Sequence, residues 1–210
     1  MGSKGVSVFL SVLAFVVIEA SIGAQAARRV LLTPKPDPAD AAATARWLVS
    51  QNSWGTLSTI NDELGGAPFG HVISFSDGFP NKGQGIPYFY LTTLDVTARN
   101  AMKDARSSFA VSEIALGSCG KTDPQNPTCA KLTLTGKLKV VDKNSKEGEF
   151  AKAALFSKHS EMKGWPNDHN FLFFKLEIEN LFLIDWFGGA KPLTVEQYLH
   201  PRNVNMVRVI

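Results

Sequence analysis

Two stretches of the chain alternate hydrophobic and polar side chains with a period of two. Residues 132–140 alternate leucine and valine with threonine and lysine, and residues 172–179 follow the same pattern with lysine and glutamate at most of the polar positions. Because successive side chains of a strand point to opposite faces, both stretches predict β-strands with one buried face. The alternation stops over residues 181–184, which we interpret as the part of the second strand that enters a fully packed interior. Gly188 and Gly189 end this strand.

Shorter apolar runs between turn-forming residues predict four further strands. These strands span residues 54–60, 70–76, 88–92 and 107–116. The pair Gly65-Gly66 marks a turn within residues 61–68. Three glycines and one proline mark an exposed loop over residues 77–85.

Helix-favouring segments lie between these strands. They span residues 38–51, 94–104, 145–157 and 194–199. Asp37, Ser145 and Thr194 can cap three of these helices, and Pro38 suits a first helical position because its missing N–H is not needed there. The side chains expected to face the core from the first three helices are Ala43, Trp47, Leu48, Leu94, Ala98, Ala101, Met102, Phe150, Ala153, Ala154 and Phe156.

Six strands at this spacing, interrupted by a few helices, predict a mainly β protein with peripheral helices. The pattern is typical of a closed antiparallel barrel. Side chains fill the interior of a small barrel, so the leucine, valine and phenylalanine positions are assigned to its core.

The amino-terminal segment is predicted to be a signal peptide over residues 1–26. Lys4 precedes an apolar run over residues 6–18, and small residues lead to a cleavage point between Ala26 and Ala27. The run is too short to span a bilayer, which takes about 20 apolar residues. Residues 27–36 then form a linker, and residues 37–210 form a single domain. We expect a protein of the secretory pathway, either extracellular or in a lysosome or vacuole.

Composition and charge are those of a globular protein without a nucleic-acid surface. Hydrophobic residues make up 44% of the chain and charged residues 20%, with a net charge of +3. The basic residues do not gather into a stripe, which binding to phosphates would require. No later run is long enough to cross a membrane.

The two cysteines, Cys119 and Cys129, bracket a loop with two prolines. In an oxidising compartment such a pair usually forms a disulfide. Two independent free thiols are the alternative. A zinc site is disfavoured because no second pair of ligands has matching spacing.

Several blocks of the sequence together resemble one known family. Residues 158–191 place a helix end, a Trp165-Pro166 turn, the second long strand and an aromatic-Gly-Gly stop in one order. With residues 54–60, 73–78 and 86–91, this order resembles the CREG family of secreted proteins. The resemblance implies a six-stranded antiparallel split β-barrel, of the FMN-binding, flavin reductase-like type, that forms homodimers and holds no flavin. Animal CREG proteins are glycoproteins, whereas this sequence has no Asn-x-Ser/Thr site, because a proline disables the one at Asn126.

The resemblance also allows the flavin site to be tested residue by residue. Pyridoxamine 5'-phosphate oxidase-like barrels hold the FMN phosphate with basic residues, and the corresponding positions carry no permanent cation here. Those positions are His71, Ser76, Thr97 and Ala98. If FMN binds at all, its phosphate is expected to contact Thr92, Thr93, Thr97 and Arg99. Each lost charge-assisted partner weakens such a site by roughly 1.5–3 kcal/mol, so we expect no tightly bound cofactor.

The remaining candidate chemistry is weak. The four histidines do not pair at a metal-binding spacing, and no Gly-x-Ser-x-Gly motif accompanies Asp168-His169. No catalytic residue and no metal ligand are assigned. Loop residues that cap turns account for these side chains.

The functional hypothesis is that the protein is not an enzyme and acts as a homodimer through contacts with an unknown receptor or partner. The resemblance to the CREG family implies a regulator of growth or differentiation. The aromatic residues expected at the dimer interface are Tyr88, Phe89, Tyr90, Trp186 and Phe187. The alternatives are a flavin or haem oxidoreductase of the pyridoxamine 5'-phosphate oxidase type and a module that binds another small ligand.

Overall fold

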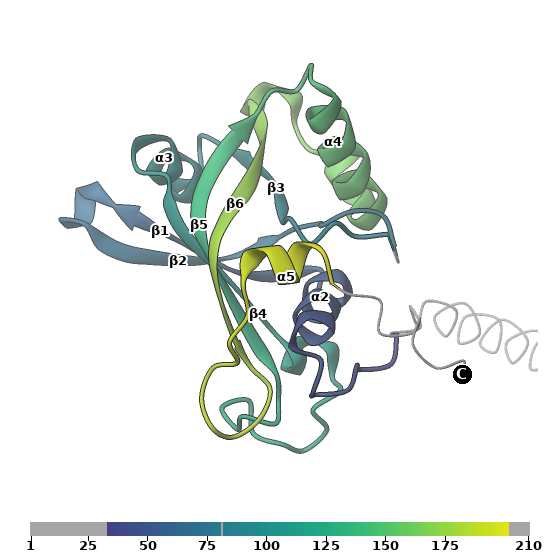
Figure 1. The fold of residues 1–210 in the computed structure, drawn as a ribbon. Coiled ribbons are helices and arrows are strands. Elements are labelled where there is room, and N and C mark those ends of the chain that lie inside the picture. The colour runs from purple at the N-terminus through teal and green to yellow at the C-terminus, as the bar shows by residue number, and fades with distance from the viewer. Residues whose placement is uncertain (1–32, 81, 202–210) are drawn as a thin grey trace, which may run out of the picture. The chain divides into compact units, whose positions relative to one another are not determined.

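Six antiparallel strands form one curled sheet, in the order β2-β1-β4-β5-β6-β3, in the part of the chain that the computed structural model describes (Figure 1). The described residues are 33–80 and 82–201. The strands are β1 (Trp54–Asn61), β2 (Ala67–Ser74), β3 (Tyr88–Thr92), β4 (Arg106–Ser112), β5 (Lys131–Val141) and β6 (Phe171–Ile184). The chain divides into two units, Met1–Thr33 and Pro34–Ile210, and the fold belongs to the second. The predicted signal peptide, its Ala26–Ala27 cleavage point and most of the linker lie outside the described residues.

The two edge strands of the sheet, β2 and β3, approach each other where the chain leaves β2. Ser76 and Tyr88 form an isolated antiparallel bridge, in which each N–H donates to the other's carbonyl at 3.1 and 2.8 Å. The sheet therefore curls into a split barrel, which confirms the predicted fold class.

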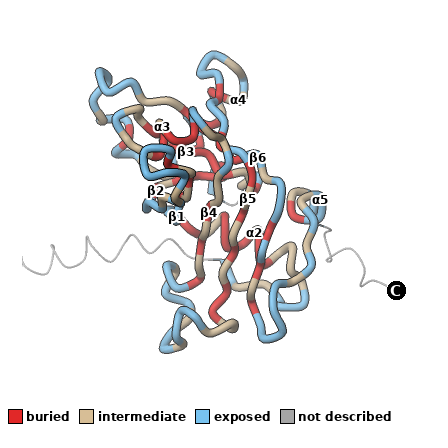
Figure 2. Tube along the Cα trace, turned by 90° about the vertical axis from the view of Figure 1, so that its left-hand side faces the viewer, coloured by how far each residue is buried: buried red, intermediate tan, exposed pale blue. Residues whose placement is uncertain are grey.

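The helices in the described residues are α2 (Ala41–Gln51), α3 (Val96–Lys103), α4 (Lys146–Lys158) and α5 (Val195–Leu199). Short 3₁₀ turns are η2 (Asp62–Leu64), η3 (Glu113–Leu116), η4 (Ser160–Gly164) and η5 (Asn167–His169). Leu48 of α2, Ala98 of α3 and Tyr198 of α5 belong to the core inside the barrel. Figure 2 shows this core as the buried parts of the central strands and α2, with exposed loops around it.

The barrel core is built from cross-strand neighbours. Leu57 pairs with Phe109 and Phe109 with Leu134, and all three side chains are fully buried. Phe75 and Phe89 meet the Phe109 ring edge-on, with ring centroids 4.7 and 5.1 Å away. Such edge-to-face pairs stabilise a core beyond the area they bury.

A second apolar cluster lies between α4 and the outer face of β3 and β6. It includes Tyr88, Leu155 and Phe173, with Tyr90 packed against it. The Tyr90 ring stacks on the Phe173 ring at 5.0 Å. Phe173, on the polar side of the predicted strand, is buried because α4 covers that side.

The β5–β6 pairing contains a register jump. Thr135 pairs with Asn180, while the next residue, Gly136, pairs with Ile178. A Cβ atom on Gly136 would lie 1.9 Å from the carbonyl oxygen of Glu177. Only glycine therefore fits at this position of β5.

The jump leaves Glu179 as one extra residue on β6, which shifts the alternation of that strand by one. As a result Leu176 before the bulge and Leu181 after it both face the interior. The interpretation that residues 181–184 enter a fully packed interior is wrong, because Phe182 is 53% exposed. This part of β6 keeps one open face.

Several boundaries differ from the prediction. The first helix begins at Ala41 with Asp40 as its cap, because the Asp40 carboxylate accepts from the N–H of Ala43. Asp37 instead accepts from the N–H of Ala39 in the preceding turn. β2 begins at Ala67 and β4 ends at Ser112, where η3 follows. Four side chains assigned to the core are exposed, namely Leu94, Met102, Val140 and Ala153.

The end of α4 is anchored in a buried junction with α2. Lys158 Nζ donates to the carbonyl oxygens of Ser50 and Asn52, at 3.4 and 2.5 Å, and lies 4.8 Å from the centroid of the Phe75 ring. Nε2 of His159 lies 2.9 Å from the carbonyl oxygen of Phe75. Burial lowers the pKa of both Lys158 and His159.

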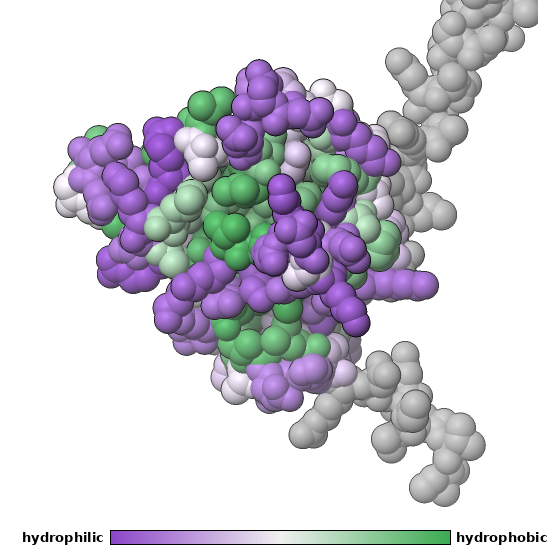
Figure 3. Space-filling model, turned by 90° about the horizontal axis from the view of Figure 1, so that it is seen from above, coloured by the Kyte–Doolittle hydropathy of each residue, from purple (hydrophilic) through white to green (hydrophobic). Residues whose placement is uncertain are grey.

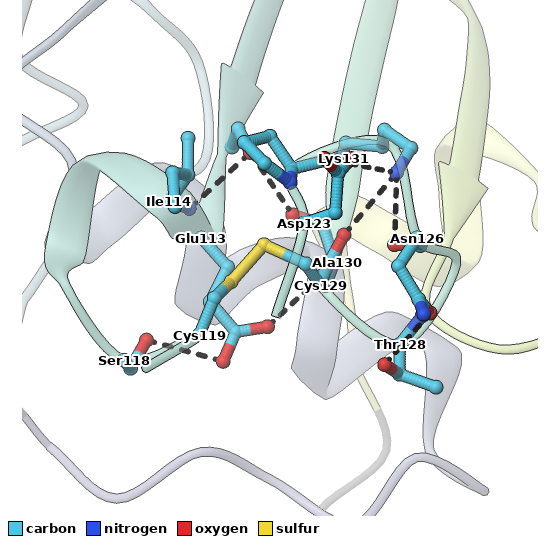
Figure 4. The surroundings of a disulfide bond; sticks show 12 residues. Glu113, Ile114, Ser118, Cys119, Asp123, Asn126, Thr128, Cys129, Ala130 and Lys131 are labelled. Carbon is cyan, nitrogen blue, oxygen red and sulfur yellow. Dashed lines mark hydrogen bonds between the residues drawn. A yellow bond between two sulfur atoms is a disulfide. The ribbon is translucent and has the colours of Figure 1, made fainter. Parts of the chain in front are cut away.

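The structure joins Cys119 and Cys129 in a disulfide, with the two Cα atoms 5.4 Å apart (Figure 4). Lys131 Nζ lies 3.0–3.4 Å from four carbonyl oxygens of the loop, those of residues 124, 125, 126 and 129, among which its three N–H groups are shared. The covalent bond and the ammonium group together hold the loop between β4 and β5 in one conformation.

A buried carboxylate lies next to this disulfide. Glu113 accepts from the N–H of Ala130 at 2.9 Å and from the Ser118 hydroxyl at 3.1 Å. Lys35 Nζ contacts the same carboxylate at 2.5 Å. The segment before α2 is thereby attached to the disulfide loop.

We predict that replacing both cysteines, Cys119→Ser with Cys129→Ser, lowers the free energy of unfolding by about 2–3 kcal/mol, because the unfolded chain loses a short covalent loop. Urea unfolding measures the change, and reduction of the wild-type protein should lower its stability equally. Peptide mapping without reductant should recover one linked fragment with both cysteines. Labelling of both thiols in the native, non-reduced protein would contradict the prediction.

We also predict that His159 makes the fold less stable in acid. Its pKa is lowered by burial, which outweighs the Phe75 carbonyl, and by Lys158, while Glu161 opposes the shift. The unfolded chain then binds the proton more readily, so this contribution is complete above about pH 6.5 and is lost as the pH falls toward the lower folded pKa.

The test is His159→Gln, whose amide can still donate to Phe75 without titrating. Its melting temperature should fall less than that of the wild type between pH 7.5 and pH 5. His200→Gln is the control. It shows how much the substitution of an exposed histidine changes the fall in melting temperature between the same two pH values. Equal acid sensitivity of His159→Gln and the wild type would contradict the prediction.

Candidate functional site

The candidate anion site lies where β3 turns into α3. We name it the β3–α3 corner and define it as residues 92–99 together with His71 of β2. It contains the residues expected to contact a flavin phosphate, Thr92, Thr93, Thr97 and Arg99.

The amino-terminal end of α3 is occupied by its own carboxylate. Asp95 is the cap of α3, and its Oδ1 accepts from the N–H of Thr97 at 2.6 Å. Its Oδ2 lies 3.3 Å from Nδ1 of His71. A helix amino terminus attracts anions because its N–H groups are unsatisfied. Here an aspartate already satisfies one of them and carries a negative charge.

The arginine of the corner is turned toward its own backbone. Arg99 Nη1 donates to the carbonyl oxygens of Thr93 at 3.1 Å and of Leu94 at 2.8 Å. The Thr92 hydroxyl donates to the carbonyl oxygen of His169 and accepts from the N–H of Leu94. These groups hold the β3–α3 turn together, so they are engaged within the protein.

Two further positions of the predicted phosphate site are buried. Thr97 and Ala98 have no exposed surface, and Oγ1 of Thr97 has no hydrogen-bond partner among the described residues. Ser76 lies at the bridge to Tyr88 instead, where its hydroxyl donates to the Gly78 carbonyl at 2.9 Å. The structure thus brings His71, Thr97 and Arg99 to one corner but engages Ser76 elsewhere.

Asp95 is the residue of the β3–α3 corner that the sequence interpretation missed. The segment Leu94-Asp95-Val96 carries the signal, because aspartate is a favoured helix cap. The signal was lost because the helix was predicted to begin at Leu94, one residue before its cap.

The histidines lie apart from one another. His159 faces the Phe75 carbonyl, the His169 ring stacks on Phe171 with centroids 6.3 Å apart, and Nε2 of His200 lies 3.9 Å from Glu196. The described residues include no cluster of three or more His, Cys, Asp or Glu side chains suited to a metal ion.

A second candidate site is a sheet face that carries small, uncharged side chains. The register aligns two rows across β2, β1, β4, β5 and β6. We name these rows the outer sheet face, and they consist of Val72, Thr56, Ala110, Thr133 and Phe182, and of Gly70, Ser58, Ser108, Thr135 and Asn180. Val72 is 60% exposed, and none of the ten residues is charged.

The aromatic residues expected at a dimer interface divide into two groups. Tyr88 and Phe89 are buried in their own chain, and Tyr90 is half-buried beneath α4. The expectation that Tyr88 and Phe89 lie at a dimer interface is therefore wrong. Trp186 and Phe187 are 53% and 65% exposed and follow β6 directly after Asp185.

The view from above, onto the side of α3 and α4, shows apolar surface in patches among hydrophilic side chains (Figure 3). Among the described residues, no helix combines the length and apolar character that a membrane span requires.

Known proteins are similar to this chain in sequence. A family model described as "CREG, beta-barrel" matches residues 36–200. Human Protein CREG1 is 40% identical over 171 residues, which cover 80% of this chain and 77% of that protein. Human Protein CREG2 is 40% identical over 167 residues, which cover 78% of this chain and 57% of that protein.

Solved structures share the fold. A heme binding protein from Mycobacterium smegmatis superposes with a TM-score of 0.62 at 20% identity, covering 80% of this chain and 62% of that one. The protein Atu2129 from Agrobacterium tumefaciens has a TM-score of 0.55 at 24% identity, covering 74% of this chain and 60% of that one. At this identity the likeness shows the split barrel alone. The family model and the identity to both human proteins show that the chain belongs to the CREG family.

Proposed function

We propose that this protein acts without catalysis, as a homodimer in the secretory pathway, through contacts with other proteins. The observation that carries the proposal is the carboxylate of Asp95 at the amino terminus of α3. A split barrel that used this helix to hold a flavin phosphate would place a dianion against that carboxylate. The neighbouring His71 already contacts the same Asp95, with Nδ1 3.3 Å from Oδ2.

The arginine cannot replace the missing cations without breaking contacts of its own. Arg99 would have to leave the carbonyl oxygens of Thr93 and Leu94, to which it donates. Each hydrogen bond from a charged donor is worth roughly 1.5–3 kcal/mol. FMN binding would therefore cost the β3–α3 turn part of its stability, and this supports a protein without a flavin cofactor.

The proposed secretory location rests on one feature of the sequence and one of the structure. Residues 1–26 have the layout of a signal peptide, and the described fold contains the Cys119–Cys129 disulfide. Disulfides persist in oxidising compartments. Both features fit export to the cell exterior or to a lysosome or vacuole.

The homodimer rests on the outer sheet face. A surface of small, uncharged side chains can approach its own copy closely, since no charge has to be removed from water. Phe182 and Val72 mark opposite ends of one row and supply the apolar area. A two-fold pair buries the same surface on both copies, so each copy covers the exposed Phe182 of the other.

The first prediction for this function is that purified protein has no flavin absorption. When protein is titrated into FMN, flavin fluorescence should not reach saturation below about 100 µM protein, which corresponds to a binding free energy weaker than roughly 5 kcal/mol. The variant Asp95→Asn retains a helix cap but loses the charge. It should bind FMN measurably more tightly than the wild type. Saturation of the wild type at low micromolar FMN, abolished by Arg99→Ala, would overturn the proposal and support the oxidoreductase.

The second prediction is that light scattering at micromolar concentration gives twice the mass of one chain, and that Phe182→Glu halves it. The charge would have to be buried between two copies without a partner. The control is Leu64→Glu, at a 62% exposed position of η2, which should remain dimeric. A monomeric wild type, or a Phe182→Glu protein that stays dimeric, would refute this use of the sheet face.

A further inference from the structure

A groove separates the first turns of α2 from α5. Its volume is about 1230 Å³, and Pro36 and Pro201 are among the residues that line it. Arg46 of α2 donates to the carbonyl oxygens of Tyr198 and Leu199, so the two helices lie side by side (Figures 1 and 2).

The groove combines an apolar floor with acidic side chains. Small and apolar residues line it, among them Ala39, Ala42 and Leu193. Its carboxylates belong to Asp37, Asp40 and Glu196.

These carboxylates retain capacity for another donor. Asp37 and Asp40 each use Oδ1 for a backbone N–H, and the second oxygen of each has no hydrogen-bond partner among the described residues. The Glu196 side chain is 83% exposed, and its contact with His200 is 3.9 Å long. Arg46 is the groove's permanent cation among the described residues, and it already serves three backbone carbonyls, including that of Gly83. The groove therefore presents unneutralised negative charge beside apolar surface.

The nine residues that follow Pro201 have the complementary chemistry. Their sequence is Arg-Asn-Val-Asn-Met-Val-Arg-Val-Ile, with two arginines, no acidic residue and five aliphatic or thioether side chains. Extended, such a segment reaches about 30 Å. Arginine is well suited to the site, because its guanidinium fork pairs with carboxylates through two hydrogen bonds.

Tethering favours this occupant over a free peptide. Pro201 itself lines the groove, so the next residue starts at its rim. A segment attached this closely has an effective concentration of about millimolar or higher.

We propose that the α2–α5 groove is a docking site for the chain's own segment of residues 202–210. Arg202 and Arg208 pair with the carboxylates of Asp37, Asp40 and Glu196, and the aliphatic side chains cover the alanine and leucine floor. A partner protein reaches this groove only by displacing the segment.

Zero-length carbodiimide coupling tests the contact in the full chain. Carbodiimide joins lysine to carboxylates and leaves arginine unreacted, so Arg208→Lys places a reactive amine on the segment. Mass spectrometry should find it joined within the same chain to Asp37, Asp40 or Glu196. The control is Asn203→Lys, which places the amine at a position that carries no charge in this chain. This variant should couple less to the three carboxylates than Arg208→Lys does.

Hydrogen exchange provides the independent measurement. Arg202→Glu combined with Arg208→Glu should raise amide exchange several-fold in peptides covering residues 36–43 and 192–200. Adding Glu196→Arg should restore part of the protection. The charge-matched control, Lys121→Glu with Lys163→Glu, should leave these peptides unchanged.

Two results would overturn the proposal. One is equal exchange in the wild type and the charge-reversed variant together with the absence of intramolecular coupling. The other is coupling only between two chains, lost on dilution, which would make a second copy the occupant.

Discussion

The close contact at Gly136 is the constraint on which the split barrel depends. A side chain there would meet the carbonyl oxygen of Glu177 at 1.9 Å, so a residue without Cβ is required for β5 to stay paired with β6 across the bulge. The extra residue, Glu179, then lets leucines on both sides of it face the interior. Without that shift, one half of the longest strand would turn its leucines to water. The core and the open outer sheet face both follow from this arrangement.

The alternation of apolar and polar residues and the helix-capping residues predicted which strands and helices form. They did not predict the contacts between these elements. The strand now called β5 was predicted within one residue of its ends, because leucine and valine alternate with threonine and lysine along it, with Gly136 at one of the apolar positions. The bulge was missed because Glu179 looks like any other polar position until the partner strand is known. Leu94 and Met102 were assigned to the core wrongly, since α3 has eight residues and too few turns to define its buried face from sequence. At the candidate site the missing cations were visible in sequence, whereas the contact between His71 of β2 and Asp95 before α3 joins residues 24 positions apart and is visible only in the structure.

The same fold can carry opposite electrostatics at one helix end. The amino terminus of α3 has the N–H groups that would suit a phosphate, yet the chain supplies an aspartate there. One carboxylate therefore occupies the helix end that would otherwise suit an anion. This is why membership of the CREG family and the split-barrel fold say less about chemistry than the side chains of the β3–α3 corner do.

The contact between Lys35 and Glu113 has a consequence for processing by proteases. The ammonium group of Lys35 is held by the buried carboxylate of Glu113, at 2.5 Å. A protease that recognises basic side chains needs that ammonium group in its own specificity pocket. We therefore expect the peptide bond after Lys35 to resist cleavage in the folded protein, so that the mature form retains Lys35. The disulfide loop, far along the chain, sets the amino-terminal boundary of the domain.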